Sequence, residues 1–210
     1  MPISPIKLAV LISGSGTTLQ NLIDEITAKR LDAQIAVVVA SRPGLLGLER
    51  AAKAGLKSVV VERRKYADIP AFSRDVFAHC AGVDLICLAG WLSFLEIPPQ
   101  FAGRIINIHP ALLPSFGGRG MYGSHVHQAV LAQGCKISGC TVHFVDEEYD
   151  NGPIILQRTC PVEEDDTPQS LAHRVFEQEK IAYPQAIRLF QQGRLSIVNR
   201  RVRVAGPSHA

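Results

Sequence analysis

Several features that would define common protein classes are missing from this 210-residue sequence. No apolar run is long enough to span a membrane, and no cysteine pair has the spacing of a zinc site or a dithiol motif. A formal net charge of +3 argues against nucleic acid as a partner. The small basic cluster of Arg200, Arg201 and Arg203 is interpreted as a solvated strand edge. We therefore expect no membrane, no nucleic acid and no metal among its partners.

The cysteines indicate a reducing compartment. There are five, an odd number that leaves no complete set of pairs. Cys87 lies in an apolar run and is interpreted as a core residue. The N-terminal apolar run at residues 8–12 is too short for a signal peptide and leads directly into a glycine loop. We expect a cytoplasmic protein.

The first half alternates two kinds of pattern. Short apolar runs predict buried strands at residues 7–12, 35–40, 58–61, 83–89 and 105–108. Helical spacing between them predicts helices at residues 19–29, 45–54 and 69–80. This alternation predicts an α/β fold of the Rossmann-like type, with a doubly wound, mostly parallel sheet.

The second half is expected to add antiparallel strands. We predict a glycine-rich loop at residues 113–126, with Gly117, Gly118, Gly120 and Gly123, and a helix at 127–133. Strands at 137–145 and 154–162 should form a hairpin. A helix capped by Thr167 should break or bend near Pro184, before a final strand at 195–204. We expect one domain over residues 1–210, with a phosphate-binding half at about 1–105 and a catalytic half at about 106–204.

The strongest chemical signal is the pair Asn107 and His109. The two lie on one face of a predicted strand, which ends before Pro110 at the edge where α/β sheets place their sites. An amide donor beside a titratable imidazole suits a reaction that forms an oxyanion and moves a proton.

The loop after the first strand is a candidate anion site. Residues 13–19 read Ser-Gly-Ser-Gly-Thr-Thr-Leu and lead into the first predicted helix, whose amides favour an anion. The loop lacks the lysine of a P-loop and the third glycine of a dinucleotide motif, and Ser41-Arg42 follows the second strand where a ribose-binding carboxylate would stand. A single phosphate is the favoured ligand, and a tight turn without ligand is the alternative.

The remaining polar clusters are ambiguous. The acidic loop at residues 146–152 could supply a carboxylate to orient His109 and raise its pKa, with Asp150 best placed and Asp146 next. His125 and His127 have strand-like spacing but no third metal ligand. His143 is interpreted as a structural histidine. Trp91 could belong to the core or line a pocket.

Three segments carry a family resemblance: residues 11–20, residues 106–114 with the pattern Asn-x-His-Pro-x-Leu-Leu-Pro, and residues 139–145 together with 150–153. From residue 7 to about 204 the chain resembles the phosphoribosylglycinamide formyltransferases, which are folate-dependent enzymes of purine synthesis. The resemblance implies transfer of a formyl group from 10-formyltetrahydrofolate to the amine of glycinamide ribonucleotide, by a monomer or homodimer.

The resemblance also implies residue roles. Asn107, His109 and Asp150 would be catalytic. Gly16, Thr17, Thr18 and Glu179 would bind the ribonucleotide, and Leu92, Ser93, Phe94 and Leu95, with Asn107, would bind the folate.

Three features depart from the family pattern. The folate stretch reads Trp-Leu-Ser-Phe-Leu, where many members have Phe-Met-Arg-Ile-Leu. A folate-contacting arginine falls on Ile69, where Arg63, Arg64 or Arg74 could substitute, and the loop at 116–124 is longer than in some members.

The nearest rival is formyltetrahydrofolate hydrolase, which shares the Asn, His and Asp set but usually carries an N-terminal regulatory domain. Methionyl-tRNA formyltransferase is disfavoured by its additional C-terminal domain and by the low net charge here. A non-catalytic binding module would not need the complete Asn, His and Asp set.

Overall fold

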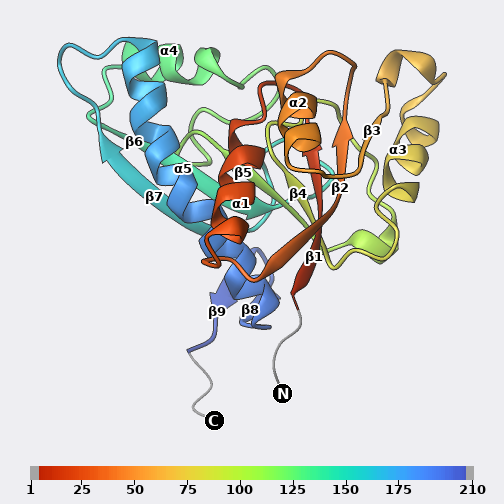
Figure 1. The fold of residues 1–210 in the computed structure, drawn as a ribbon. Helices are drawn as coiled ribbons and strands as arrows, with labels where there is room; N and C mark the ends of the chain where they lie inside the picture. Colours follow the sequence, from red (N-terminus) through yellow and green to blue (C-terminus); the bar gives the residue numbers. More distant parts are fainter. Residues whose placement is uncertain (1–4, 207–210) are drawn as a thin grey trace. The chain divides into compact units, whose positions relative to one another are not determined.

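A computed structural model describes residues 5–206. Seven strands form one sheet in the order β3-β2-β1-β4-β5-β6-β7, and β8 and β9 form a separate hairpin (Figure 1). The chain divides into two compact units, residues 1–106 and 107–210. The boundary falls inside β5 (Ile105–His109), so that this strand begins in one unit and ends in the other. The predicted mostly parallel α/β sheet is confirmed.

The first unit is a parallel α/β layer. Its strands are β1 (Ile6–Ile12), β2 (Ala33–Ala40), β3 (Ser58–Val60) and β4 (Leu85–Leu88), and its helices are α1 (Thr17–Thr27), α2 (Leu46–Lys53) and α3 (Ile69–Ala78). Strand β1 pairs in parallel with β2 and β4, and β2 pairs in parallel with β3. All four residues of β4 and six of the seven in β1 are buried, as expected for parallel strands covered on both faces.

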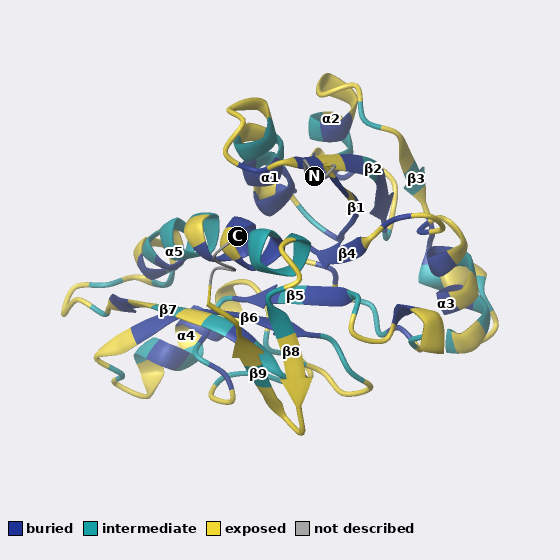
Figure 2. Cartoon of the chain, turned by 90° about the horizontal axis from the view of Figure 1, so that it is seen from below, coloured by how far each residue is buried: buried dark blue, intermediate teal, exposed yellow. Residues whose placement is uncertain are grey.

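The second unit combines two helices with antiparallel strands. It contains α4 (Ser124–Ala132), β6 (Ile137–Phe144), β7 (Ile154–Pro161), α5 (Pro168–Gln191), β8 (Leu195–Val198) and β9 (Arg201–Val204). Strands β6 and β7 pair antiparallel, as predicted, and α5 packs on both of them. Figure 2 shows the β8–β9 hairpin as mostly exposed.

Helix starts follow the expected capping chemistry. The Asp68 side chain accepts a hydrogen bond from the amide of Ala71 at the start of α3. Thr167 and Ser170 form a reciprocal capping box at the start of α5, with Pro168 as the first helical residue. These local signals explain why both starts could be predicted from sequence.

Two C-terminal elements differ from the sequence predictions. Helix α5 was expected to break or bend near Pro184; it does not break but continues through this buried residue to Gln191. The packing of α5 on β6 and β7 outweighs the missing amide hydrogen bond. The expected single strand at 195–204 is a hairpin that turns at Asn199, whose φ is +56°.

Helix α4 begins three residues earlier than predicted, at Ser124. His125 and His127 therefore lie on a helix, where a two-residue spacing points their side chains to different faces, and only His127 is buried. Within residues 5–206, no helix combines the length and apolar character needed to cross a membrane.

Candidate active site

The second unit brings together all three predicted catalytic residues. Asn107 and His109 end β5, and His109 is only 3% exposed. Asp150 lies in the loop between β6 and β7. Its Oδ2 atom is 3.5 Å from His109 Nδ1, and its Oδ1 atom is 3.4 Å from Asn107 Nδ2. The expected association of an amide, an imidazole and a carboxylate is therefore present, although their roles stay predictions.

Both ring nitrogens of His109 face hydrogen-bond acceptors. Nε2 is 2.8 Å from the backbone carbonyl of Phe116, and Nδ1 faces Asp150. A neutral imidazole carries one N–H and can satisfy only one of these acceptors, whereas an imidazolium satisfies both. The geometry therefore suits a histidine that gains a proton during a reaction.

The amide of Asn107 is oriented by a second histidine. Nδ1 of His143 is 2.8 Å from the carbonyl of Phe144, so this nitrogen carries the hydrogen and donates it. Nε2 of His143 is then an acceptor, and Asn107 Nδ2 lies 3.1 Å away as its donor. The remaining amide hydrogen is directed at Asp150 over the longer distance of 3.4 Å. That weaker contact is the one a substrate oxygen could replace.

His143 is the member of the site that sequence reasoning missed. It was interpreted as structural, yet its Nε2 atom lies 3.1 Å from Asn107 Nδ2 and 3.8 Å from Asp150 Oδ1. The available signal was its position on β6, the strand next to β5 in the sheet. The alternation of residues along this strand could not by itself distinguish His143 from a histidine buried in the core.

The backbone around Asp150 is held in a special conformation. Asp150 has φ +53°, in the left-handed region, and its Oδ2 atom accepts a 2.9 Å hydrogen bond from the amide of Gly118. Gly152 lies directly against the carbonyl oxygen of Phe144, where a Cβ atom would collide with it. The Asp150-Asn151-Gly152 turn therefore tolerates no side chain at Gly152.

The pKa of His109 differs from the one that the sequence led us to expect. Burial lowers the pKa of His109, although the Asp150 carboxylate and the Phe116 carbonyl act in the opposite direction. We expected Asp150 to raise the pKa of His109, and it does act in that direction, but burial outweighs it. Burial acts to raise the pKa of Asp150, but the nearby His143, His109 and Gly118 amide together lower it. At neutral pH the pair is thus a carboxylate and a neutral imidazole.

The predicted phosphate loop lies in the first unit. Helix α1 begins at Thr17, after Gly16 with φ +71°, and no side chain caps its first turn. Thr17 is exposed and Thr18 is buried, so the Thr17 hydroxyl is the more accessible of the two. The uncapped amides suit an anion, as the sequence suggested.

This loop packs closely on α2. A Cβ atom on Gly16 would lie 2.6 Å from the Cα atom of Gly47. Arg50 on α2 donates from Nε to the Ser15 carbonyl at 3.0 Å and from Nη1 to the Gln20 side chain at 3.2 Å. The two glycines and the arginine together fix the position of the loop.

The predicted folate stretch also lies in the first unit. Leu92 is 46% exposed, Leu95 is buried, and Ser93 and Phe94 are intermediate. The Leu92 amide donates to Ser13 Oγ at 3.1 Å, which connects this stretch to the glycine loop. Trp91 is buried and stacks on Phe72 with ring centroids 6.1 Å apart, so it belongs to the core.

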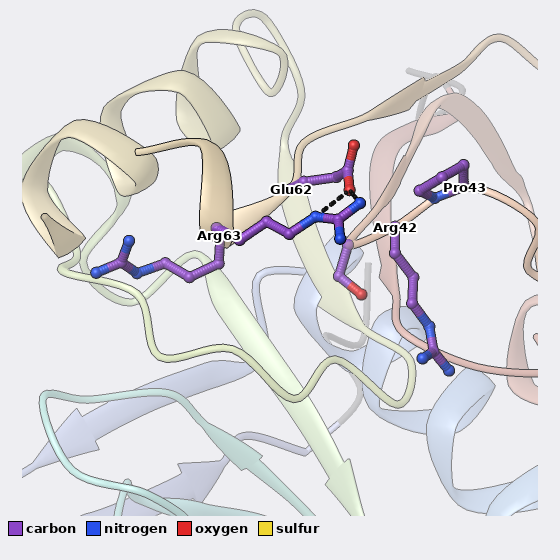
Figure 3. Close-up of a pocket in the computed structure, with 6 residues that line it drawn as sticks. Arg42, Pro43, Glu62 and Arg63 are labelled. Atoms are coloured by element: carbon purple, nitrogen blue, oxygen red, sulfur yellow. Dashed lines mark hydrogen bonds and ion pairs between the residues drawn. The ribbon is translucent and has the colours of Figure 1, made fainter. Parts of the chain in front are cut away.

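Two of the three arginines considered for the folate tail line a pocket of about 390 Å³ (Figure 3). The pocket residues follow β2 and β3: Ser41, Arg42, Pro43, Glu62, Arg63 and Arg64. The buried Glu62 carboxylate binds Arg64 Nη2 at 2.7 Å and Lys65 Nζ at 2.6 Å. Arg63 extends away from Glu62, and its guanidinium lies 5.9 Å from the centre of the Phe72 ring. Arg74 on α3 does not line this pocket.

Glu179 lies on α5 in the second unit. Its carboxyl is desolvated by burial, which raises its pKa to about 7. Within the part of the chain that the structure describes, no group of three or more His, Cys, Asp or Glu side chains could hold a metal.

Comparison with known proteins shows which proteins the chain resembles. The model of the family described as formyl transferase matches residues 6–187. A phosphoribosylglycinamide formyltransferase of Haemophilus influenzae is 37% identical over 195 residues, which are 91% of this chain and 90% of that protein. The structure of glycinamide ribonucleotide transformylase 1 from Symbiobacterium toebii has a TM-score of 0.86 and 42% identity, covering 96% of this chain and 95% of the other.

Longer relatives contain a similar region. The trifunctional purine biosynthetic protein adenosine-3 of Drosophila melanogaster is 41% identical over 193 residues, which are 89% of this chain. The chain spans 14% of the length of that relative.

Proposed function

Because the chain belongs to the formyl transferase family, we propose that it transfers the formyl group of 10-formyltetrahydrofolate to the amine of glycinamide ribonucleotide. The observation that carries this proposal is the set of Asn107, His109 and Asp150 in the second unit. An oxyanion donor, a titratable group and a carboxylate are the groups that acyl transfer to an amine requires. The product, formylglycinamide ribonucleotide, belongs to purine synthesis.

The proposed reaction begins with attack of the amine on the formyl carbon. The carbonyl oxygen becomes an oxyanion, which Asn107 stabilises after its weaker contact with Asp150 is released. His109 stabilises the same oxyanion and exchanges a proton, and Asp150 orients its ring and supports the imidazolium that forms. The carbon–nitrogen bond to N10 of the folate then breaks. One proton passes from the amine to N10, and no water is consumed.

The ribonucleotide is proposed to bind through its phosphate at the glycine loop. The amides of Gly16, Thr17 and Thr18 supply donors at the start of α1, and the Thr17 hydroxyl is exposed beside them. Glu179 is proposed to contact the ribose hydroxyls. Its pKa of about 7 permits it to accept or donate a hydrogen bond at neutral pH.

The folate is proposed to bind along Leu92, Ser93, Phe94 and Leu95, as well as at Asn107. Among the arginines considered, Arg63 is the favoured partner for the carboxylates of its glutamate tail. Arg64 is engaged by Glu62, whereas Arg63 keeps donors beyond its 2.8 Å hydrogen bond from Nη1 to the carbonyl of Tyr66. A cytoplasmic location and a monomeric or homodimeric state complete the proposal.

A direct assay tests this function. Purified protein is incubated with 10-formyltetrahydrofolate, with and without glycinamide ribonucleotide, and release of tetrahydrofolate is followed. Release that requires the ribonucleotide, together with a formylated product, supports transfer. Release at the same rate without it would identify a hydrolase, and no release in either case would identify a binding protein.

A further inference from the structure

The terminal hairpin contacts the loop that carries Asp150. Arg200 lies at the turn between β8 and β9, in the basic cluster that sequence analysis interpreted as a solvated edge. Its Nη2 atom donates to the backbone carbonyl of Asn151 and, at 3.0 Å, to the Asn151 side-chain oxygen. Asn151 directly follows Asp150, so the guanidinium holds the residue adjacent to the proposed catalytic carboxylate.

The Arg200 contact adds to the hydrogen bonds within the loop. Residues 147–149 are exposed, and Asp150 adopts a left-handed conformation that an aspartate does not favour by itself. Asn151 also donates to Asp146 at 3.4 Å, which extends the Arg200 contact into the first part of the loop. The carboxylate of Asp150 accepts from the Gly118 amide and faces Asn107 and His109, whereas Arg200 holds the backbone and side chain of the next residue.

A cavity separates most of the Asp150 loop from the terminal hairpin, and the Arg200–Asn151 contact lies at its edge. This cavity of about 470 Å³ is lined by Asp150, Asn151 and the residues up to Ile154, and also by Arg200, Arg201 and Val202 of the hairpin. The side of the loop that faces the cavity lacks van der Waals packing, and the Arg200 hydrogen bonds join the loop to the hairpin across this boundary.

We propose that Arg200 is a positioning residue, which holds the Asp150 turn so that the carboxylate stays aligned with His109. This inference rests on the proposed function. Arg200 does not contact the reacting groups. It acts through Asn151, and the guanidinium fork suits this task because its planar donors can address two oxygens of one residue.

The test compares Arg200→Met with Arg203→Met. Arg203 lies on β9 of the same hairpin and, within residues 5–206, makes no hydrogen bond or ion pair from its guanidinium, so its substitution controls for lost charge. Arg200→Met should lower kcat by roughly three- to tenfold through misalignment of Asp150, with little change in KM for the ribonucleotide or in Tm. Arg203→Met should match the parent, and Arg200→Lys should recover part of the loss.

The pH dependence of kcat distinguishes a positioning role of Arg200 from a purely electrostatic effect of its charge. A displaced Asp150 supports the His109 imidazolium less well, so the apparent pKa in the kcat profile should move to lower pH in Arg200→Met. Simple loss of a nearby positive charge would instead move it to higher pH. That upward shift, an equal loss in Arg203→Met or an unchanged kcat in Arg200→Met would overturn the proposal.

A double variant tests whether Arg200 acts through Asp150. In an Asp150→Asn background, Arg200→Met should cause no further loss, because the residue that it positions no longer acts. A full additional loss would show that Arg200 acts elsewhere. If Asp150→Asn itself retained parental activity, the proposed catalytic role would fail, which is distinct from failure of the Arg200 inference alone.

Discussion

His109 shows how one residue can be tuned by opposing effects. Burial lowers its pKa, while the Asp150 carboxylate and the Phe116 carbonyl favour its protonated form. The imidazole is therefore neutral at rest but has acceptors in place for a second N–H. This arrangement suits a group that must take up a proton only during the reaction.

At the residue scale, Asp150→Asn should separate chemistry from binding. It keeps the size of the side chain but removes the charge that supports the imidazolium. We expect turnover to fall by roughly two to four orders of magnitude, the usual contribution of a positioned acid–base group. The ribonucleotide Kd, measured by calorimetry, should change much less, because its phosphate is proposed to bind in the first unit.

Adding His109→Ala to Asp150→Asn should cost little beyond His109→Ala alone, since the two residues act as a unit. Parental turnover of Asp150→Asn between pH 6 and 9 would direct the search to Asp146 instead.

Glu179 gives a second prediction at this scale, for stability. Burial raises its pKa from an ordinary 4.5 to about 7. As pH rises from about 4.5 to 7, the unfolded chain releases this proton first, so the raised pKa makes stability fall with increasing pH. Glu179→Gln removes this penalty and should gain stability relative to the parent between pH 5 and pH 8, as measured by urea denaturation.

Glu177→Gln on the same helix provides the control, since the Glu177 side chain is 45% exposed. A constant stability difference between Glu179→Gln and the parent across this pH range would contradict the prediction.

At the element scale, the glycine loop and α2 behave as one assembly. Gly16 and Gly47 permit the backbones to approach, and Arg50 joins them through the Ser15 carbonyl. The phosphate site is therefore proposed to depend on α2, although α2 contributes none of its predicted ligands.

Gly16→Ala tests this dependence. The new Cβ atom would lie 2.6 Å from the Gly47 Cα atom, at a position with φ +71°, so the loop must move away from α2. We expect the ribonucleotide Kd to rise by roughly tenfold or more, because misplaced amides lose their hydrogen bonds to the phosphate. Folate binding should remain largely intact.

The matched control for Gly16→Ala is Gly14→Ala, whose Cβ atom would meet no atom within 4 Å. Equal effects of the two substitutions, or equal loss of both ligands in Gly16→Ala, would argue against this separate phosphate site.

At the scale of the whole molecule, the cysteines report on the folded state. Within residues 5–206 none of the five forms a disulfide; four are buried, and Cys135 is half-buried. Burial raises the pKa of Cys80 and Cys140 to about 12, so they remain thiols at neutral pH. Titration of the native protein with a thiol reagent at pH 8 should modify one cysteine rapidly, whereas the denatured chain should react at five.

Cys135→Ser should abolish this rapid phase. Rapid modification of several cysteines in the native protein would contradict the burial of the other four.

The local pattern of apolar residues was sufficient to predict much of the fold. Apolar runs separated by helical spacing determined the parallel strands of the first unit, because the period of the apolar residues sets which faces are buried. It also placed Asn107 and His109 together at the end of β5, since strand alternation and Pro110 act within a few residues. Where tertiary packing competes with a local signal, as at Pro184 in α5, the break that the sequence allowed does not occur.

Only the tertiary structure decided how the site is completed. Asp150 and His143 come to Asn107 from 43 and 36 residues away, and Arg200 reaches Asn151 across 49 residues. No periodicity links such distant residues, because their proximity depends on strand pairing and on the course of loops. The lowered pKa of His109 has the same origin, since it reflects how completely the folded chain removes the imidazole from water.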